Sequence, residues 1–167
     1  MSLDLDKIKK ELEVLPKYKE QIALQGTKDN LDPFYPCGAE IFNNTGRREH
    51  EFDTPIFDMP YINSIIKDLK MFRTRVMILK SRTCYTYHKD TTKRIHIPLV
   101  TNDKCFFIIN SQVKHYPADG NYYVVDTTQM HTALNASKED RIHIIGVING
   151  LQCLSLIHIS EPTRLDD

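Results

Sequence analysis

KRIHIPLV, residues 93–100, alternates basic and aliphatic side chains in its first half. Successive side chains of a β-strand point to opposite faces, so Arg94 and His96 share one face and the aliphatic residues that separate and follow them share the other. An aliphatic face is expected to pack against a core, whereas a guanidinium and an imidazole together are typical of a polar cavity. The stretch therefore predicts a strand with one apolar side and one wet, charged side.

Six further stretches between residues 73 and 148 are short, rich in β-branched or aromatic residues, and bounded by turn residues. They are RTRVMILK (73–80), TCYTYH (83–88), KCFFIIN (104–110), QVKHYP (112–117), NYYVVD (121–126) and RIHIIGVI (141–148). Strands that recur about every ten residues are typical of antiparallel sheets in a sandwich or barrel. We therefore expect a mainly β protein with a jelly-roll-like core.

Helices are predicted before the first of these strands. The apolar positions of the first helix are Leu5, Ile8, Leu12 and Leu15. Their three- and four-residue spacing predicts an amphipathic helix that Pro16 ends, and a second short helix is expected to end near Leu24. Residues 26–60 are rich in Gly, Pro, Asn and Asp and predict loops, after which Pro60 suits the first turn of another helix. The apolar positions of that helix are Ile62, Ile65, Ile66 and Leu69.

Length and charge exclude several classes of protein. The chain has 167 residues, 41% of them hydrophobic, with 22 basic and 22 acidic side chains. This length fits one domain, which we place at residues 1–153, with a helical and loop part at 1–71 and the β core at 72–150. Balanced charge creates no strong field, so neither nucleic acid nor a membrane is expected as a partner.

The chain start and the cysteines indicate a cytoplasmic protein. MSLDLDKIKKELEVL is acidic and amphipathic, which is typical of neither a secretion signal nor a membrane span. The cysteines are Cys37, Cys84, Cys105 and Cys153, and no Cys-x-x-Cys pair occurs among them. We therefore expect reduced thiols.

The last residues are expected to be foreign to the protein. LSLIHISEPTR, residues 154–164, resembles the in-frame translation of the mosaic-end adaptor used in transposon-made sequencing libraries. We therefore treat residues 154–167 as a non-native tail and exclude them from the interpretation of the fold.

The ionisable residues between the predicted strands suggest a metal site. His88 and Asp90 are two residues apart at the end of a strand, so their side chains are expected to face the same way. His131 follows the strand NYYVVD and a polar turn, and a neighbouring strand could bring it alongside this pair. Two imidazoles and one carboxylate leave three positions of an octahedron open, which suits non-haem Fe(II) in oxygenases. We predict that these three residues bind the metal and are catalytic.

Arg141 is the candidate anchor for a carboxylate cosubstrate at this metal. It begins RIHIIGVI, which is otherwise too apolar to accommodate a guanidinium unless the face shared by Arg141 and His143 lines a pocket. The planar guanidinium matches the geometry of a carboxylate. Arg141 is therefore expected to hold the far end of a cosubstrate that chelates the metal.

Several of these motifs, in this order, resemble a known family. They are HKD (88–90), RIHIPLVTN (94–102), GNYYVVD (120–126), MHTALN (130–135) and DRIHIIG (140–146). Together they are similar to the aspartyl/asparaginyl β-hydroxylase and proline hydroxylase branch of the Fe(II)- and 2-oxoglutarate-dependent oxygenases. The likeness spans roughly residues 73–148; the N-terminal third matches no family that we can name, and we expect it to set substrate specificity.

The resemblance implies a fold, a reaction and roles for six residues. The fold is a double-stranded β-helix, a relative of the jelly roll. His88, Asp90 and His131 would hold Fe(II), and Arg141 would bind the distal carboxylate of 2-oxoglutarate. Arg94 and His96 would lie against this cosubstrate. The reaction would use dioxygen to hydroxylate an unactivated C–H bond of an amino acid, a peptidyl residue or a small molecule, with succinate and carbon dioxide as coproducts.

Two alternatives stay open at this point. A cupin-like barrel could hold a metal or a small acid without turnover, because jelly-roll barrels support many functions. Arg94 and His96 could instead form a polar patch between neighbouring strands at the surface.

Overall fold

The computed structural model describes residues 2–35 and 45–148. The helical elements are α1 (Leu5–Glu11), the 3-10 helices η1 (Leu12–Val14) and η2 (Glu49–Glu51), and α3 (Pro60–Asp68). The short strands of the N-terminal part are β1 (Gln21–Ala23), β2 (Gln25–Gly26) and β3 (Thr54–Pro55). The strands of the core are β4 (Phe72–Leu79), β5 (Thr83–Cys84), β6 (Arg94–Val100), β7 (Cys105–Ile109), β8 (Gln112–Lys114), β9 (Tyr123–Val125), β10 (His131–Asn135) and β11 (Arg141–Val147).

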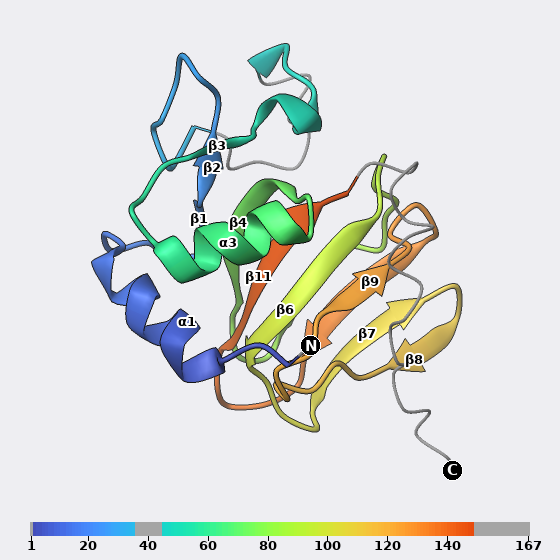
Figure 1. Ribbon diagram of the computed structural model, residues 1–167. Coiled ribbons are helices and arrows are strands. Elements are labelled where there is room, and N and C mark those ends of the chain that lie inside the picture. The colour runs from blue at the N-terminus through green and yellow to red at the C-terminus, as the bar shows by residue number, and fades with distance from the viewer. Residues whose placement is uncertain (1, 36–44, 149–167) are drawn as a thin grey trace.

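The core strands form two antiparallel sheets. One sheet has the order β1-β4-β11-β6-β9 (Figure 1), and the other has the order β5-β10-β7-β8. The pairs are nested along the chain, because β7 pairs with β8, β6 with β9, β5 with β10, and β4 with β11. A folded-back ribbon of this kind is a jelly roll, and the predicted double-stranded β-helix is confirmed.

Each of the seven predicted stretches contains a strand, and β10 is a further strand that the sequence pattern did not predict. This strand pairs with β5 on one side and β7 on the other. Its sequence, HTALN, combines alanine and asparagine with few β-branched residues, so its own strand propensity is low. Pairing with two neighbours imposes the extended conformation, and His131, Ala133 and Asn135 all become buried.

The N-terminal helices cover the outer face of the five-stranded sheet. Figure 1 shows α3 lying across this sheet, with α1 beside it. Ile95, Ile97 and Leu99 of β6 join the same hydrophobic cluster as Ile8 of α1 and Ile62 of α3. The aliphatic face of KRIHIPLV therefore packs against helices, as its alternation predicted, and Arg94 and His96 face the space between the two sheets. The helices predicted at Leu5 and Pro60 are confirmed.

The short helix predicted to end near Leu24 is wrong. Residues Gln21–Ala23 form β1, which pairs with β4 in the register Gln21↔Met77. The backbone N–H of Leu24 donates to the carbonyl of Thr74, and the Ile22 side chain is completely buried. The edge of β4 offers unpaired backbone groups, and pairing with them stabilises this segment more than an isolated turn of helix would.

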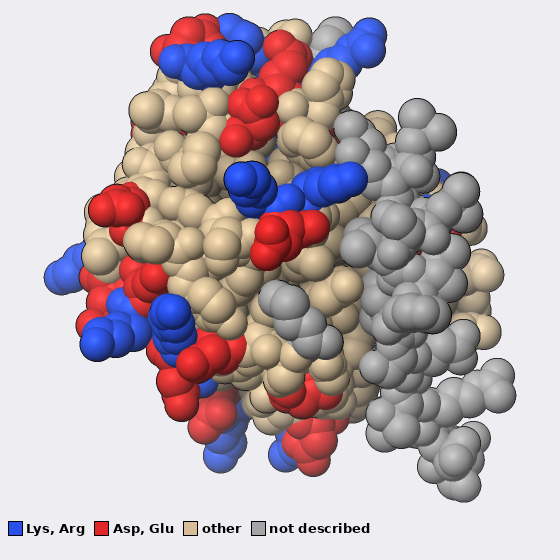
Figure 2. Space-filling model, viewed as in Figure 1, with Lys and Arg blue, Asp and Glu red and all other residues tan. Residues whose placement is uncertain are grey.

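Other sequence expectations concern the surface and the chain ends. Within the described ranges, no helix is long and apolar enough to cross a bilayer. The face drawn in Figure 2 carries basic and acidic side chains close together, as balanced charge predicts. Cys84 is exposed and Cys105 is buried, and both are free thiols. Cys37, Cys153 and the tail expected to be non-native, residues 154–167, lie outside the described residues.

Candidate metal centre

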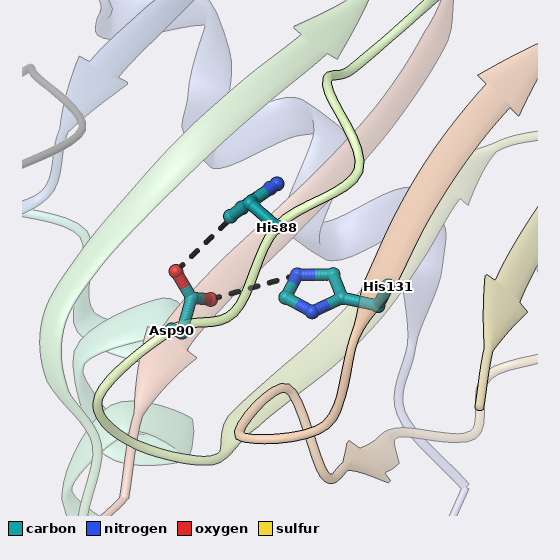
Figure 3. Close-up of side chains that lie close together, drawn as sticks. All are labelled: His88, Asp90 and His131. Carbon is teal, nitrogen blue, oxygen red and sulfur yellow. Dashed lines mark ion pairs between the residues drawn. The ribbon is translucent and has the colours of Figure 1, made fainter.

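Three predicted ligands converge at one end of the space between the sheets. His88 and Asp90 belong to the irregular segment after β5, and His131 is the first residue of β10 (Figure 3). The backbone fixes this arrangement, because His88 and His131 exchange N–H···O bonds of 3.0 and 2.8 Å, and the Asp90 N–H donates to the carbonyl of Thr127 at 2.8 Å. His131 therefore lies beside His88 and Asp90, as the sequence predicted.

The three side chains point toward one another. Asp90 Oδ1 lies 3.8 Å from His88 Nε2, and Asp90 Oδ2 lies 3.8 Å from His131 Nε2. The ligand atoms all lie within 4.8 Å of one another. Two donors that each lie about 2.1 Å from a shared ion are at most about 4.2 Å apart, and both Asp90 distances meet that limit. Small side-chain rotations would complete the coordination.

In each of the two histidines, a hydrogen bond to a backbone carbonyl fixes which ring nitrogen faces the other candidate ligands. His88 Nδ1 lies 2.6 Å from the carbonyl oxygen of Thr86, and His131 Nδ1 lies 2.9 Å from that of Gln129. A carbonyl oxygen only accepts, so both Nδ1 atoms carry a proton and both Nε2 atoms are left to face Asp90. Backbone carbonyls orient metal-binding histidines in this way.

This geometry places electron-rich atoms against one another. His131 is buried, and burial lowers its pKa, so its imidazole is neutral at neutral pH. A neutral Nε2 lone pair facing a carboxylate oxygen at 3.8 Å is unfavourable unless a cation lies between them. The donor set therefore fits a divalent transition metal, and two imidazoles with one carboxylate suit Fe(II) with open coordination positions.

A cavity of about 490 Å³ opens from this centre between the two sheets. All six residues predicted to form the site line it. Its charged lining residues are Arg73, Arg75, Lys89, Asp90, Arg94 and Arg141. Among the described residues, the lining thus holds five cations and one carboxylate, which favours an anionic ligand.

Arg141 is the cation that is best placed to bind such a ligand. Its side chain is 3% exposed, and its Nε has no hydrogen-bond partner among the described residues. Burial lowers the pKa of Arg141, and no acidic side chain of the described ranges forms an ion pair with it. A buried guanidinium without a carboxylate is costly, so the site is prepared for an anion supplied from outside.

Arg94 is held by two carboxylates. Its Nη2 lies 2.9 Å from Glu49 Oε1, and its Nε lies 3.3 Å from Asp90 Oδ2. Arg94 therefore helps to orient Asp90, the predicted metal ligand, through the oxygen that also faces His131. Its predicted contact with a cosubstrate stays a prediction, although it lines the same cavity.

Glu49 is the residue that sequence reasoning missed. It lies on η2, only 9% exposed, and also pairs with Arg73 Nη1 at 2.7 Å. Burial alone would raise its pKa, but the ion pairs with Arg94 and Arg73 and the hydrogen bond from Thr92 lower it to about 2. The only signal in the sequence was the presence of arginines on buried strands, which require a counter-charge but do not identify it.

Comparison with known proteins gives a family and a set of structural neighbours. The sequence model of aspartyl/asparaginyl beta-hydroxylase matches residues 4–148, so the match begins well before the motifs that carried the resemblance. A search of curated proteins finds no match.

Solved structures that resemble this one include cupin domains of low sequence identity. The plu4264 protein of Photorhabdus luminescens is 15% identical, with a TM-score of 0.40 over 50% of this chain and 68% of its own. A cupin domain from Bordetella pertussis Tohama I is 11% identical, with a TM-score of 0.41 over 47% and 81%. A predicted oxalate decarboxylase from Thermotoga maritima is 19% identical, with a TM-score of 0.40 over 51% and 72%.

Proposed function

The chain belongs to the aspartyl/asparaginyl β-hydroxylase family, and from this premise we propose that it is an Fe(II)- and 2-oxoglutarate-dependent dioxygenase. In this proposal it hydroxylates an unactivated C–H bond of a free amino acid or of an aspartyl, asparaginyl or prolyl residue in a peptide. Succinate and carbon dioxide are the coproducts. Hydroxylation is the activity that the family name carries, and the residues of the site support the finer assignments.

One observation supports the proposal most directly. The buried, neutral imidazole of His131 directs a lone pair at the Asp90 carboxylate, and the His88 imidazole faces the same carboxylate. The guanidinium of Arg141, which has no ion pair among the described residues, lines the same cavity. The two imidazoles and the Asp90 carboxylate suit a divalent metal, and the guanidinium of Arg141 suits a carboxylate. A 2-oxo acid with a second carboxylate satisfies both, because one end chelates a metal while the other pairs with Arg141.

The chain's own residues would orient the reactants and exclude water. When bound, Fe(II) and 2-oxoglutarate would supply the oxidising chemistry with dioxygen. Arg94 would hold Asp90 aimed at the metal, and the carbonyls of Thr86 and Gln129 would hold the two imidazoles in the metal-binding tautomer. Phe107, Ala133 and Ile145 contribute apolar walls that favour a dry enclosure.

The test is a cosubstrate assay. Purified protein incubated with Fe(II), 2-oxoglutarate and oxygen should release succinate, slowly even without a second substrate. His131→Ala should abolish this release, because the metal loses a ligand, whereas His50→Ala should keep it, since His50 is exposed and lies outside the cavity. A panel of amino acids and peptides, scored by mass spectrometry for a gain of one oxygen, would then identify the substrate.

The competing function is a cupin-like module that binds a metal or small acid without turnover. Tight metal binding without oxygen uptake for any member of the panel would favour it. Succinate release that depends on His131 would exclude it.

A further inference from the structure

Two buried histidines on neighbouring strands form a pair beside the cavity. His96 lies on β6 and His143 on β11, and they are 3% and 1% exposed. Their Nδ1 atoms lie 3.3 Å apart, with ring planes at 86°. His96 lines the cavity, whereas His143 does not. The pair therefore connects His143, which does not line the cavity, to His96, which does.

The number of protons on this pair follows from its surroundings. Burial lowers the pKa of both histidines well below the usual value of 6.5, and Arg141 lowers both further. Each ring is therefore neutral and carries one N–H and one lone pair. The contact between the two Nδ1 atoms is a hydrogen bond only if one of them donates and the other accepts.

The two possible arrangements leave different groups unsatisfied. Among the described residues, Nε2 of His143 is buried and has no hydrogen-bond partner. If His96 donated, this atom would be a buried N–H without an acceptor, which is rare in folded proteins. If His143 donates, the atom is a bare lone pair, and the nearby positive charge of Arg141 favours it.

We propose that His143 is a positioning residue that donates from Nδ1 to His96 and thereby fixes the proton of His96 on Nε2. His96 then offers an N–H donor to a carboxylate bound in the cavity. The opposite tautomer would direct a lone pair at that carboxylate and repel it. The identity of the carboxylate as 2-oxoglutarate rests on the proposed function, whereas the tautomer of His96 does not.

The direct test is the tautomer in metal-free, ligand-free protein. Two-bond ¹H–¹⁵N spectra of ¹⁵N-labelled protein distinguish protonated from bare imidazole nitrogens. We expect His96 to carry its proton on Nε2. His131 and His115, whose Nδ1 atoms face the carbonyls of Gln129 and Cys105, serve as internal references with the proton on Nδ1. A proton on Nδ1 of His96 would overturn the proposal.

Two variants test the consequence for binding. His143→Asn keeps an N–H donor near the Nδ1 position, and His143→Leu removes it. Under anaerobic conditions with Fe(II), we expect His143→Leu to weaken 2-oxoglutarate binding about tenfold and His143→Asn to stay within about threefold of the original protein. Fe(II) affinity should be unchanged in both. Equal losses in both variants, or none in His143→Leu, would contradict the role of His143.

These outcomes separate the two proposals. If the protein binds no 2-oxoglutarate, the proposed function fails, while the tautomer spectra still decide whether His143 positions His96. If 2-oxoglutarate binds but His96 carries its proton on Nδ1, the positioning role fails and the oxygenase proposal stands. Should His143→Leu fail to fold, the spectra and His143→Asn remain decisive.

Discussion

At the scale of single residues, Arg141 is both the proposed binding group for a carboxylate and a source of instability. Its guanidinium is buried, and no acidic side chain of the described residues forms an ion pair with it. Arg141→Met should therefore raise the free energy of unfolding of the ligand-free protein by about 1–3 kcal/mol, because an uncompensated buried charge is removed. Urea unfolding without ligand measures this gain.

The same substitution should weaken 2-oxoglutarate binding at least about 100-fold, since the distal carboxylate loses its cation. Calorimetric titration measures this loss, with the exposed Arg82→Met as control. Unchanged affinity in Arg141→Met, or an equal loss in Arg82→Met, would show that the anchor lies elsewhere.

At the scale of elements, the short helix η2 connects the N-terminal part to the metal centre. Glu49 on η2 faces both Arg73 and Arg94, and Arg94 in turn contacts Asp90. Glu49→Gln should lower the free energy of unfolding by about 3 kcal/mol or more, because two buried guanidiniums lose a common counter-charge. It should also weaken metal binding, since Arg94 would lose the contact with Glu49 that holds it beside Asp90.

Glu51→Gln on the same helix is the matched control for this prediction. Its carboxylate pairs with Arg47 near the surface at 3.5 Å, so the change should cost about 1 kcal/mol or less. Thermal unfolding and Fe(II) titration of both variants would measure the difference. Equal stability and metal affinity in the two variants would contradict the proposed link through η2.

Sequence patterns predicted the helices and strands whose own residues indicate their conformation. Alternation in KRIHIPLV and the spacing of Ile62, Ile65 and Ile66 each reflect a face that packs on the core, so these elements could be recognised locally. β1 and β10 could not, because pairing with strands distant in sequence determines their conformation. Secondary structure imposed by long-range partners leaves little trace in local propensity.

The residues of the candidate site also divide into those that local sequence identifies and those that only distant partners explain. His88 and Asp90 are only two residues apart, and Arg141 begins an otherwise apolar strand, so local sequence identified these three residues. His131 was identified as a histidine that follows a predicted strand and a polar turn. Glu49 is also buried, but its arginine partners are 24 and 45 residues away, and its segment has no periodic pattern. The expectation that the N-terminal third sets substrate specificity stays a prediction.

At the scale of the whole molecule, buried ionisable groups should make stability depend on pH in two stages. His96 and His143 are neutral when folded, but in the unfolded chain they bind protons below about pH 6.5. The unfolded state therefore gains protons as pH falls through this value, and each histidine should reduce stability by up to about 1.4 kcal/mol per pH unit. Above it, their contribution is constant.

Glu49 affects the stability of the protein at lower pH. Its pKa of about 2, against an ordinary 4.5, gives stability that is present above 4.5 and lost as pH falls toward 2. Urea unfolding across neutral to acidic pH should show both stages, and His143→Asn should reduce the slope of the first. A flat profile between neutral pH and about pH 5 would contradict the buried, neutral histidine pair.

The convergence of His88, Asp90 and His131 on one metal beside Arg141 is tested most directly by anaerobic optical titration. Iron-bound 2-oxoglutarate has a visible metal-to-ligand charge-transfer band, which neither component gives alone. We predict that this band appears when Fe(II) and 2-oxoglutarate are both added, disappears in His131→Ala, and requires much more 2-oxoglutarate in Arg141→Met. Absence of the band in the original protein, or a band of full intensity in His131→Ala, would contradict the account.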